Sequence, residues 1–152
     1  MGSPSAGRQL ISPRVQRHFL VISVATFDDQ TMIRIFHEIL RWYLCEKEKF
    51  VGEVQRLSDK LVHGTLEVYK NVAADLKPTP LRSHYTFNLR DFAKVIFGIC
   101  LSHKADVRDK DVATRLWIHE VTRVFGDRLI DDQDQLWLLR TLRDTTRRVF
   151  GV

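Results

Sequence analysis

Residues 83–95 read SHYTFNLRDFAKV, a stretch that combines a helix start with the beginning of an apolar face. Asn88 is a favoured N-cap residue, and Asp91, three residues later, can accept exposed amides of the first turn. The apolar residues that follow predict a buried face: Phe92, Val95, Ile96 and Ile99. Arg90 is unusual here, because a positive charge in the first turn opposes the helix dipole and costs up to about 1 kcal/mol. Asp91 or a bound phosphate would compensate it.

Two helices are expected before this stretch. The first begins at Asp28 or Asp29, either of which can cap it. Its predicted core residues recur every three or four positions: Met32, Ile35, Phe36, Ile39, Leu40 and Tyr43. The second helix runs from about residue 49 to residue 74, and Gly64 weakens it and marks where it would bend. The two prolines of residues 77–80 end it, because proline lacks an amide hydrogen and pushes the preceding residue towards extended backbone.

Two more helices are expected after this stretch, beyond a polar linker at about 102–109. The helix at about 110–128 carries an apolar face: Ala113, Leu116, Trp117, Val121, Val124 and Phe125. The last helix begins in the acidic stretch 131–134, whose carboxylates suit a helix N-terminus. The pattern therefore predicts five helices.

One segment predicts a strand. Residues 18–24, HFLVISV, form a short β-rich apolar run typical of a buried strand. A single strand cannot make a sheet, so we expect the rest of its sheet to lie outside this sequence. Residues 1–7 are interpreted as a cloning scar or a disordered N-terminus. The predicted fold class is thus mainly α, with about five helices preceded by one residual strand.

Composition narrows the class of protein. The 152 residues are 44% hydrophobic and can bury one core of ordinary size. The net charge is +5, but 24 basic and 19 acidic side chains are interspersed, so nucleic acid is not expected as a partner. A membrane is not expected either, because no apolar run approaches the roughly 20 residues that span a bilayer. Cys45 and Cys100 lie in apolar helical patterns and are expected to be reduced core thiols.

Common catalytic and metal-binding motifs are missing from the sequence. The seven glycines form no phosphate-binding loop of the type G-x-x-x-x-G-K-[ST]. His37-Glu38 and His119-Glu120 lack the second histidine of a zinc-protease helix. The acidic stretch 131–134 lacks the glycine and the distal glutamate of a calcium loop, so helix capping is the better interpretation. No metal site is expected, and no hydrolase triad stands out, although such triads are recognised by geometry rather than by spacing.

Three blocks of sequence carry a resemblance to a known family. They are SPRVQRHF at 12–19, the stretch from Pro78 to Asp91 that contains PTP and SHYTFNLRD, and RLWIHEVTRVFGDRL at 115–129. In this order and spacing they resemble dynein heavy chains, especially axonemal ones, and the segment looks like the third AAA+ module of the motor ring. The resemblance runs from about residue 8 to the C-terminus. It implies that residues 8–27 are the tail of the large α/β subdomain and residues 28–152 the helical lid.

The resemblance also implies roles for three arginines. Arg17, with Arg14 beside it, would sit where the finger arginine of an AAA+ module reaches the nucleotide of the preceding module. Val15 replaces an aromatic residue common in related chains, so either arginine could be the finger. Arg90 would sit at the sensor position of the lid, facing the γ-phosphate of the module's own nucleotide. A guanidinium suits both roles because its planar fork of donors matches phosphate oxygens. The simpler interpretation of all three is solvated surface charge.

The function implied by the resemblance is that of an ATP-driven microtubule motor of cilia and flagella. The lid would couple the nucleotide state of the third module to ring motion by turning at hinge residues 26–29. The intact motor would use ATP or ADP with magnesium. This segment lacks the Walker motifs and is expected to be inactive and to bind no cofactor by itself.

The expected partners are neighbouring AAA+ modules, microtubules, and dynein intermediate and light chains, with localisation in the cytoplasm, the cytoskeleton and the axoneme. The helical pattern also fits two other classes of protein. One is a stand-alone helical protein-interaction module, which the periodicity also allows. The other is a nucleic-acid-binding helical domain, which predicts steeply salt-dependent binding to duplex DNA.

Overall fold

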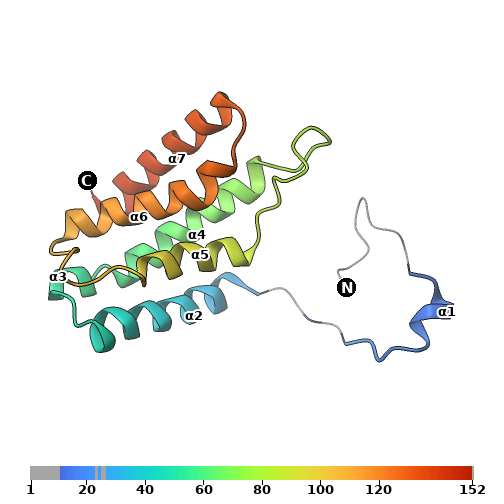
Figure 1. The fold of residues 1–152 in the computed structure, drawn as a ribbon, viewed down its shortest axis with the longest axis horizontal. Helices are drawn as coiled ribbons and strands as arrows, with labels where there is room; N and C mark the ends of the chain where they lie inside the picture. The colour runs from blue at the N-terminus through green and yellow to red at the C-terminus, as the bar shows by residue number, and fades with distance from the viewer. Residues whose placement is uncertain (1–10, 23, 25–26, 152) are drawn as a thin grey trace.

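The computed structural model describes residues 11–22, 24 and 27–151. The elements of this part of the chain are α1 (Pro13–Gln16), α2 (Asp29–Arg41), a π-helical turn η1 (Trp42–Lys47), α3 (Gly52–Gln55), α4 (Ser58–Asp75), α5 (Leu89–Ile99), α6 (Lys110–Phe125), a 3-10 turn η2 (Gly126–Arg128) and α7 (Asp132–Phe150). Figure 1 shows α2 to α7 gathered into one helical body, with α1 lying apart from it. The predicted mainly α fold is confirmed. Within the described residues, no helix is long and apolar enough to cross a membrane.

The helical body is built around α4, which packs against α2, α5, α6 and α7, while α5 packs along α6. Trp117 of α6 is fully buried at the centre, as its place in the apolar pattern predicted. Its indole Nε1 donates a hydrogen bond to Thr65 Oγ1 of α4 at 2.9 Å, and its ring centroid lies 5.0 Å from that of Phe150 in α7. Three helices therefore meet at one side chain, which gives the body a single shared core.

Two predicted helix starts are confirmed by their N-caps. Asp28 Oδ1 accepts a hydrogen bond from the amide of Thr31 at 3.1 Å at the start of α2. Asn88 and Asp91 form a reciprocal capping box at the start of α5. The last helix, α7, begins in the acidic stretch as predicted, but the side chain of its N-cap residue, Asp131, makes no cap hydrogen bond. Its carboxylate is paired with Arg82 instead.

The second predicted helix differs from the structure in two ways. It is divided into α3 and α4, and the break falls at Arg56 and Leu57. The bend expected at Gly64 is wrong, because α4 runs through this position without interruption. A Cβ at Gly64 would lie 3.1 Å from Cζ2 of Trp117, so this glycine admits the indole ring against the helix rather than bending it.

The face predicted for the first helix was too wide. Met32, Phe36 and Leu40 are buried, whereas Ile35 and Ile39 are 42% and 47% exposed. The apolar stripe of an amphipathic helix can extend beyond the part that its neighbours cover. The two isoleucines therefore belong to an exposed apolar surface rather than to the core.

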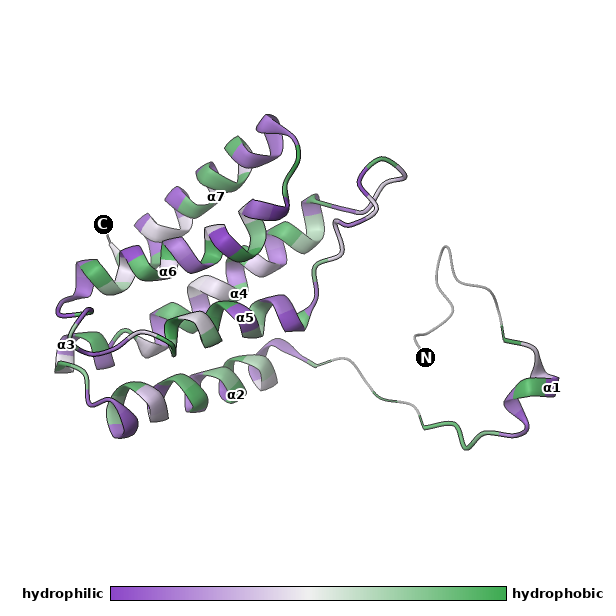
Figure 2. Ribbon diagram, viewed as in Figure 1, coloured by the Kyte–Doolittle hydropathy of each residue, from purple (hydrophilic) through white to green (hydrophobic). Residues whose placement is uncertain are grey.

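The strand predicted at 18–24 is wrong for the described residues of that segment. Residues 18–22 and Val24 have no strand structure, and Leu20 and Val24 are 89% and 84% exposed. A strand needs a neighbouring strand to pair its backbone amides and carbonyls, and the described part of this chain supplies no such neighbour. Figure 2 shows the segment as a hydrophobic stretch away from the helical body. Ser23 and residues 1–7 lie outside the described residues.

Candidate functional site

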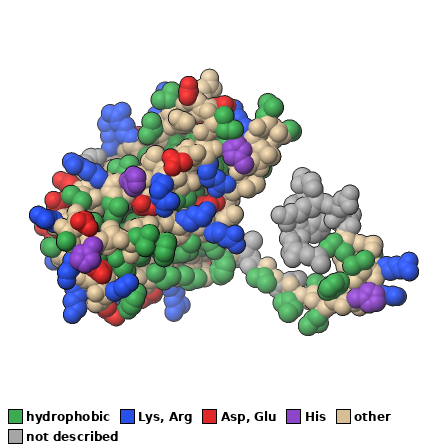
Figure 3. All heavy atoms as spheres, in the orientation of Figure 1, with side chains coloured by type: hydrophobic (Ala, Val, Ile, Leu, Met, Phe, Trp, Pro, Cys, Tyr) green, Lys and Arg blue, Asp and Glu red, His purple; other side chains and the backbone are tan. Residues whose placement is uncertain are grey.

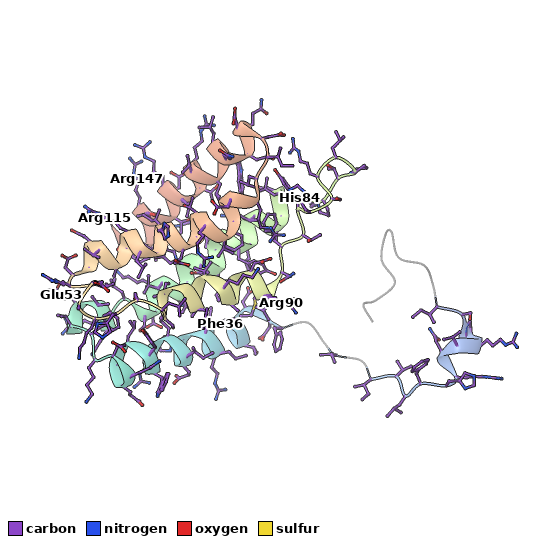
Figure 4. The ribbon with its side chains drawn as sticks, viewed as in Figure 1. Phe36, Glu53, His84, Arg90, Arg115 and Arg147 are labelled. Atoms are coloured by element: carbon purple, nitrogen blue, oxygen red, sulfur yellow. The ribbon has the colours of Figure 1, made fainter. Side chains whose placement is uncertain are left out.

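Arg90 lies in the first turn of α5, at an exposed end of the helical body (Figure 4). Its amide donates a hydrogen bond to Asn88 Oδ1 at 2.9 Å, so the cap holds the backbone of this turn. Its guanidinium forms no ion pair with any carboxylate of the described residues. The sequence-predicted sensor residue is therefore a solvent-facing cation at the positive end of a helix dipole.

Asp91 was one of the two anions expected to balance Arg90, but its carboxylate is occupied elsewhere. Oδ1 pairs with Lys94 Nζ at 3.2 Å, and Oδ2 accepts from the amide of Asn88 at 3.1 Å and pairs with Arg128 Nη1 at 3.0 Å. Burial would raise the pKa of Asp91, but the Asn88 amide, Lys94 and Arg128 together outweigh it and lower the pKa below its usual value. Asp91 is thus ionised at neutral pH and engaged by groups other than the Arg90 guanidinium.

The turn before α5 is held by Arg128, a residue to which the sequence reasoning gave no role. Arg128 Nη2 donates to the carbonyl oxygens of His84 and Thr86 at 2.9 and 3.1 Å. Its guanidinium also lies 4.9 Å from the centroid of the Phe87 ring. The only signal in the sequence was its place in the third block of the resemblance, since the contacts join residues about 40 positions apart.

A second arginine, Arg82, anchors the loop before α5 at a point further from this helix. Arg82 pairs with Asp134 at 2.7 Å and with Asp131. The hydroxyl of Tyr85 donates to Asp134 Oδ2 at 3.0 Å and accepts from the amide of Ile130 at 3.0 Å. The acidic stretch therefore fastens the loop to the start of α7.

The two finger candidates lie far from Arg90 in chain and in space. Arg14 is in α1, and Arg17 follows this helix as its C-cap residue. Both side chains are exposed, and Arg17 Nε donates to His18 Nε2 at 3.2 Å. Figure 1 shows α1 separated from the N-terminal end of α5, so the structure does not bring these arginines together with Arg90.

A metal centre finds no support in the part of the chain that the structure describes. No group of three or more histidine, cysteine, aspartate or glutamate side chains is arranged to hold a metal ion there.

Cys45 and Cys100 are both free thiols, as expected. Burial raises the pKa of the Cys100 thiol to about 11, so this side chain is neutral at pH 7.

A shallow apolar groove of about 420 Å³ lies between α2, η1 and α5. Its most exposed apolar residues are Ile39, Trp42, Phe97 and Leu101, each between 47% and 70% exposed. Figure 3 shows hydrophobic side chains gathered on this face of the helical body. An exposed cluster of this kind is typical of a surface that packs against another protein segment.

Comparison with known proteins gives a family for most of the helical body and relatives along nearly the whole chain. Residues 61–151, from α4 to the end of α7, match a family model described as AAA+ lid domain. The chain is 45% identical over 150 residues to dynein axonemal heavy chain 12 of Mus musculus. It is 39% identical over 150 residues to dynein axonemal heavy chain 3 of Homo sapiens and 41% identical over 152 residues to dynein axonemal heavy chain 1 of Homo sapiens. These matches cover 99%, 99% and 94% of this chain but only 5%, 4% and 4% of the heavy chains, so the chain spans about a twentieth of their length.

Proposed function

Because this chain belongs to the AAA+ lid domain family, we propose that it acts as the helical lid of a dynein heavy chain, an ATP-driven microtubule motor of cilia and flagella. We assign it to the third AAA+ module, with residues 8–27 as the tail of the large subdomain and residues 28–152 as the lid. The similarity to axonemal heavy chains along 99% of the chain supports this proposal. The exposed apolar groove and the exposed apolar residues at 19–22 and 24 fit surfaces that other parts of a larger protein cover.

The observation that carries the proposal is that the Arg90 guanidinium is exposed and unpaired within the described chain. Its guanidinium has no carboxylate partner in the described chain, although the helix end around it already favours anions. Asp91, which could have neutralised it, is engaged by Lys94, Arg128 and the Asn88 amide. The unpaired guanidinium of Arg90 is a planar fork of donors that suits phosphate oxygens. Arg90 would sense the γ-phosphate of the nucleotide in its own module.

Arg17 and Arg14 are proposed as the finger pair that reaches the nucleotide of the preceding module. Their exposure on α1, away from the helical body, leaves both side chains available for such a contact. An arginine delivered in this way stabilises the negative charge that develops on a phosphoryl group in transfer. Because these residues and Arg90 would address different nucleotides, their separation in this structure agrees with the proposal.

Coupling to motion would depend on the lid moving as a rigid body. The shared core around Trp117 joins α4, α6 and α7, so a force on one helix is passed to the others. The proposed hinge, residues 26–29, leads into α2 and includes its first residue, Asp29; Thr26 lies outside the described residues. Phe27 and Asp28 are exposed, so the chain can turn there without disrupting the core.

The intact motor would bind ATP or ADP with magnesium, while this segment alone, without Walker motifs, would neither hydrolyse ATP nor hold a cofactor. Its neighbours would be AAA+ modules of the same chain, and the parent would act on microtubules with dynein intermediate and light chains in the axoneme. Nucleic acid and membranes are not proposed as partners. The stand-alone interaction module is not favoured, because the similarity to motor heavy chains runs along 99% of this chain.

Replacement of Arg90 by alanine in the intact heavy chain tests the sensor role. Loss of a charge-assisted hydrogen bond of about 1.5–3 kcal/mol predicts roughly 10- to 150-fold weaker ATP binding at this module. The measurement is equilibrium titration with a fluorescent ATP analogue, with the other nucleotide sites inactivated. Arg115→Ala is the control, because Arg115 is an exposed arginine of α6 that Figure 4 shows far from Arg90. Equal affinities of the two variants and the parent would remove the sensor role.

A further inference from the structure

Arg128 joins three parts of the chain that meet beside Arg90. Its side chain contacts the carbonyl oxygens of His84 and Thr86 through Nη2, at 2.9 and 3.1 Å. Through Nη1 it pairs with Asp91 Oδ2 at 3.0 Å. Arg128 itself belongs to η2, which directly follows α6. One guanidinium therefore fastens the entry loop and the first turn of α5 to the end of α6.

The contact with Asp91 matters because Asp91 is half of the capping box. The same oxygen, Oδ2, accepts from the amide of Asn88 at 3.1 Å and pairs with Arg128. The side chain of Asp91 is only 5% exposed, so it has little freedom to move while Arg128 holds it. Arg90 lies between Asn88 and Asp91 in the chain. The direction of its Cα–Cβ bond is therefore set by the two residues that Arg128 helps to fix.

We propose that Arg128 is a positioning residue for Arg90, holding the first turn of α5 so that the Arg90 guanidinium points to one place. This inference rests on the proposed sensor function of Arg90. A small displacement of a positioned cation weakens its contact with a phosphate, since such contacts depend on both distance and direction. Arginine suits this position because one planar group contacts two carbonyl oxygens and a carboxylate, and the single ammonium of lysine would keep only some of these contacts.

Arg82 provides the matched comparison. It anchors the same loop to Asp131 and Asp134, and its side chain is 36% exposed against 30% for Arg128. It makes no contact with Asn88, Arg90 or Asp91 among the hydrogen bonds and ion pairs of the described chain. Loss of Arg82 therefore loosens the loop without releasing the capping box.

A double-mutant cycle in the intact heavy chain tests the inference. The variants are Arg90→Ala, Arg128→Met, Arg128→Lys, Arg82→Met and the Arg90/Arg128 double variant, and the readout is ATP affinity at this module. Arg128→Met is expected to weaken ATP binding about 5- to 20-fold in the parent and less than about 2-fold in the Arg90→Ala background. Arg128→Lys is expected to recover part of the loss, and Arg82→Met to cause a smaller one.

The outcomes separate this inference from the sensor proposal. If Arg90→Ala weakens ATP binding and Arg128→Met does not, the positioning role is overturned while the sensor role stands. Arg128→Met could weaken ATP binding equally with and without Arg90, or Arg82→Met could weaken it as much as Arg128→Met does. Either result would show a general structural effect and would also overturn the positioning role. If Arg90→Ala has no effect, the sensor role itself fails.

Amide exchange in this 152-residue chain is a second test. Exchange at Arg90 and Asp91 should quicken in Arg128→Met if the turn is released, and unchanged exchange would count against the inference.

Discussion

At the scale of single residues, Arg90 and Asp91 are adjacent and oppositely charged, yet they serve different purposes. Asp91 is buried and bonded to Lys94, Arg128 and the Asn88 amide, whereas Arg90 is exposed. An isolated cation in the first turn of a helix costs a few tenths of a kcal/mol up to about 1 kcal/mol. The chain bears this cost without ligand, and a phosphate beside Arg90 would remove it. Binding and helix stability are therefore linked at this turn.

The lowered pKa of Asp91 predicts how stability depends on pH. A carboxyl whose pKa is lower in the folded chain stabilises it above the unfolded pKa of about 4, and this stabilisation is lost as pH falls through the folded value. Asp91→Asn should therefore be less stable than the parent by about 2 kcal/mol at pH 7, and the difference should shrink below pH 4. Urea unfolding followed by circular dichroism from pH 7 to pH 2 measures it.

The control for this prediction is Asp106→Asn. Asp106 is exposed, and its side chain makes no hydrogen bond or ion pair within the described chain. This variant should match the parent across the pH range. A constant difference between Asp91→Asn and the parent down to pH 2 would contradict the ionised, bonded state of Asp91.

At the scale of elements, α5 and α6 approach closely at Gly98. A Cβ at this position would lie 1.9 Å from Oε2 and 2.4 Å from Cδ of Glu120. Glu120 is buried and held by Arg123, whose Nη2 donates to Oε2 at 2.6 Å. The glycine thus makes room for a buried carboxylate between two helices. Glycine destabilises a helix relative to alanine, but at this position alanine would overlap Glu120.

The effect of Gly98→Ala on stability should depend on the side chain at position 120. In the parent it should destabilise the fold by about 1–3 kcal/mol, because Glu120 must move away from Arg123. In a Glu120→Ala background the same change should be neutral or stabilise by up to about 1 kcal/mol, since alanine favours the helix. Chemical unfolding of the four chains measures both effects. Equal destabilisation in the two backgrounds would contradict the assigned contact.

Local signals in the sequence predicted the starts of α2 and α5, because Asp28 and Asn88 cap the residues next to them. The same signals failed at Gly64, where the distant Trp117 ring decides the packing. Arg128 was missed for the same reason, since its acceptors lie about 40 residues away. The strand at 18–24 has the composition of a strand, but pairing depends on a partner that the described chain does not supply. Elements set by near neighbours were predictable, and contacts between elements were not.

At the scale of the whole molecule, the described hydrophobic core is contained between Met32 and Phe150. The described residues before α2 are exposed and contribute nothing to that core. The helical body should therefore fold without them. Figure 1 shows the same separation, with the chain entering α2 from outside the body.

Removal of residues 1–27 tests this division. The shortened chain keeps the Asp28 cap and should unfold in urea with a free energy within about 0.5 kcal/mol of the full chain. It should also aggregate less, because the exposed apolar residues at 19–22 and 24 are gone. A loss of more than about 1 kcal/mol would mean that the N-terminal segment packs on the body. A version that also lacks residues 28–41, and with them α2, is the control and should fail to fold.

The most direct test of the central proposal is a structure of the motor ring that carries this lid, determined with a non-hydrolysable ATP analogue in the same module. We expect a guanidinium nitrogen of Arg90 within about 3.2 Å of a terminal phosphate oxygen. Arg128 should remain paired with Asp91 behind it. A map in which ATP is bound and Arg90 points into solvent, or pairs with a carboxylate instead, would contradict the account.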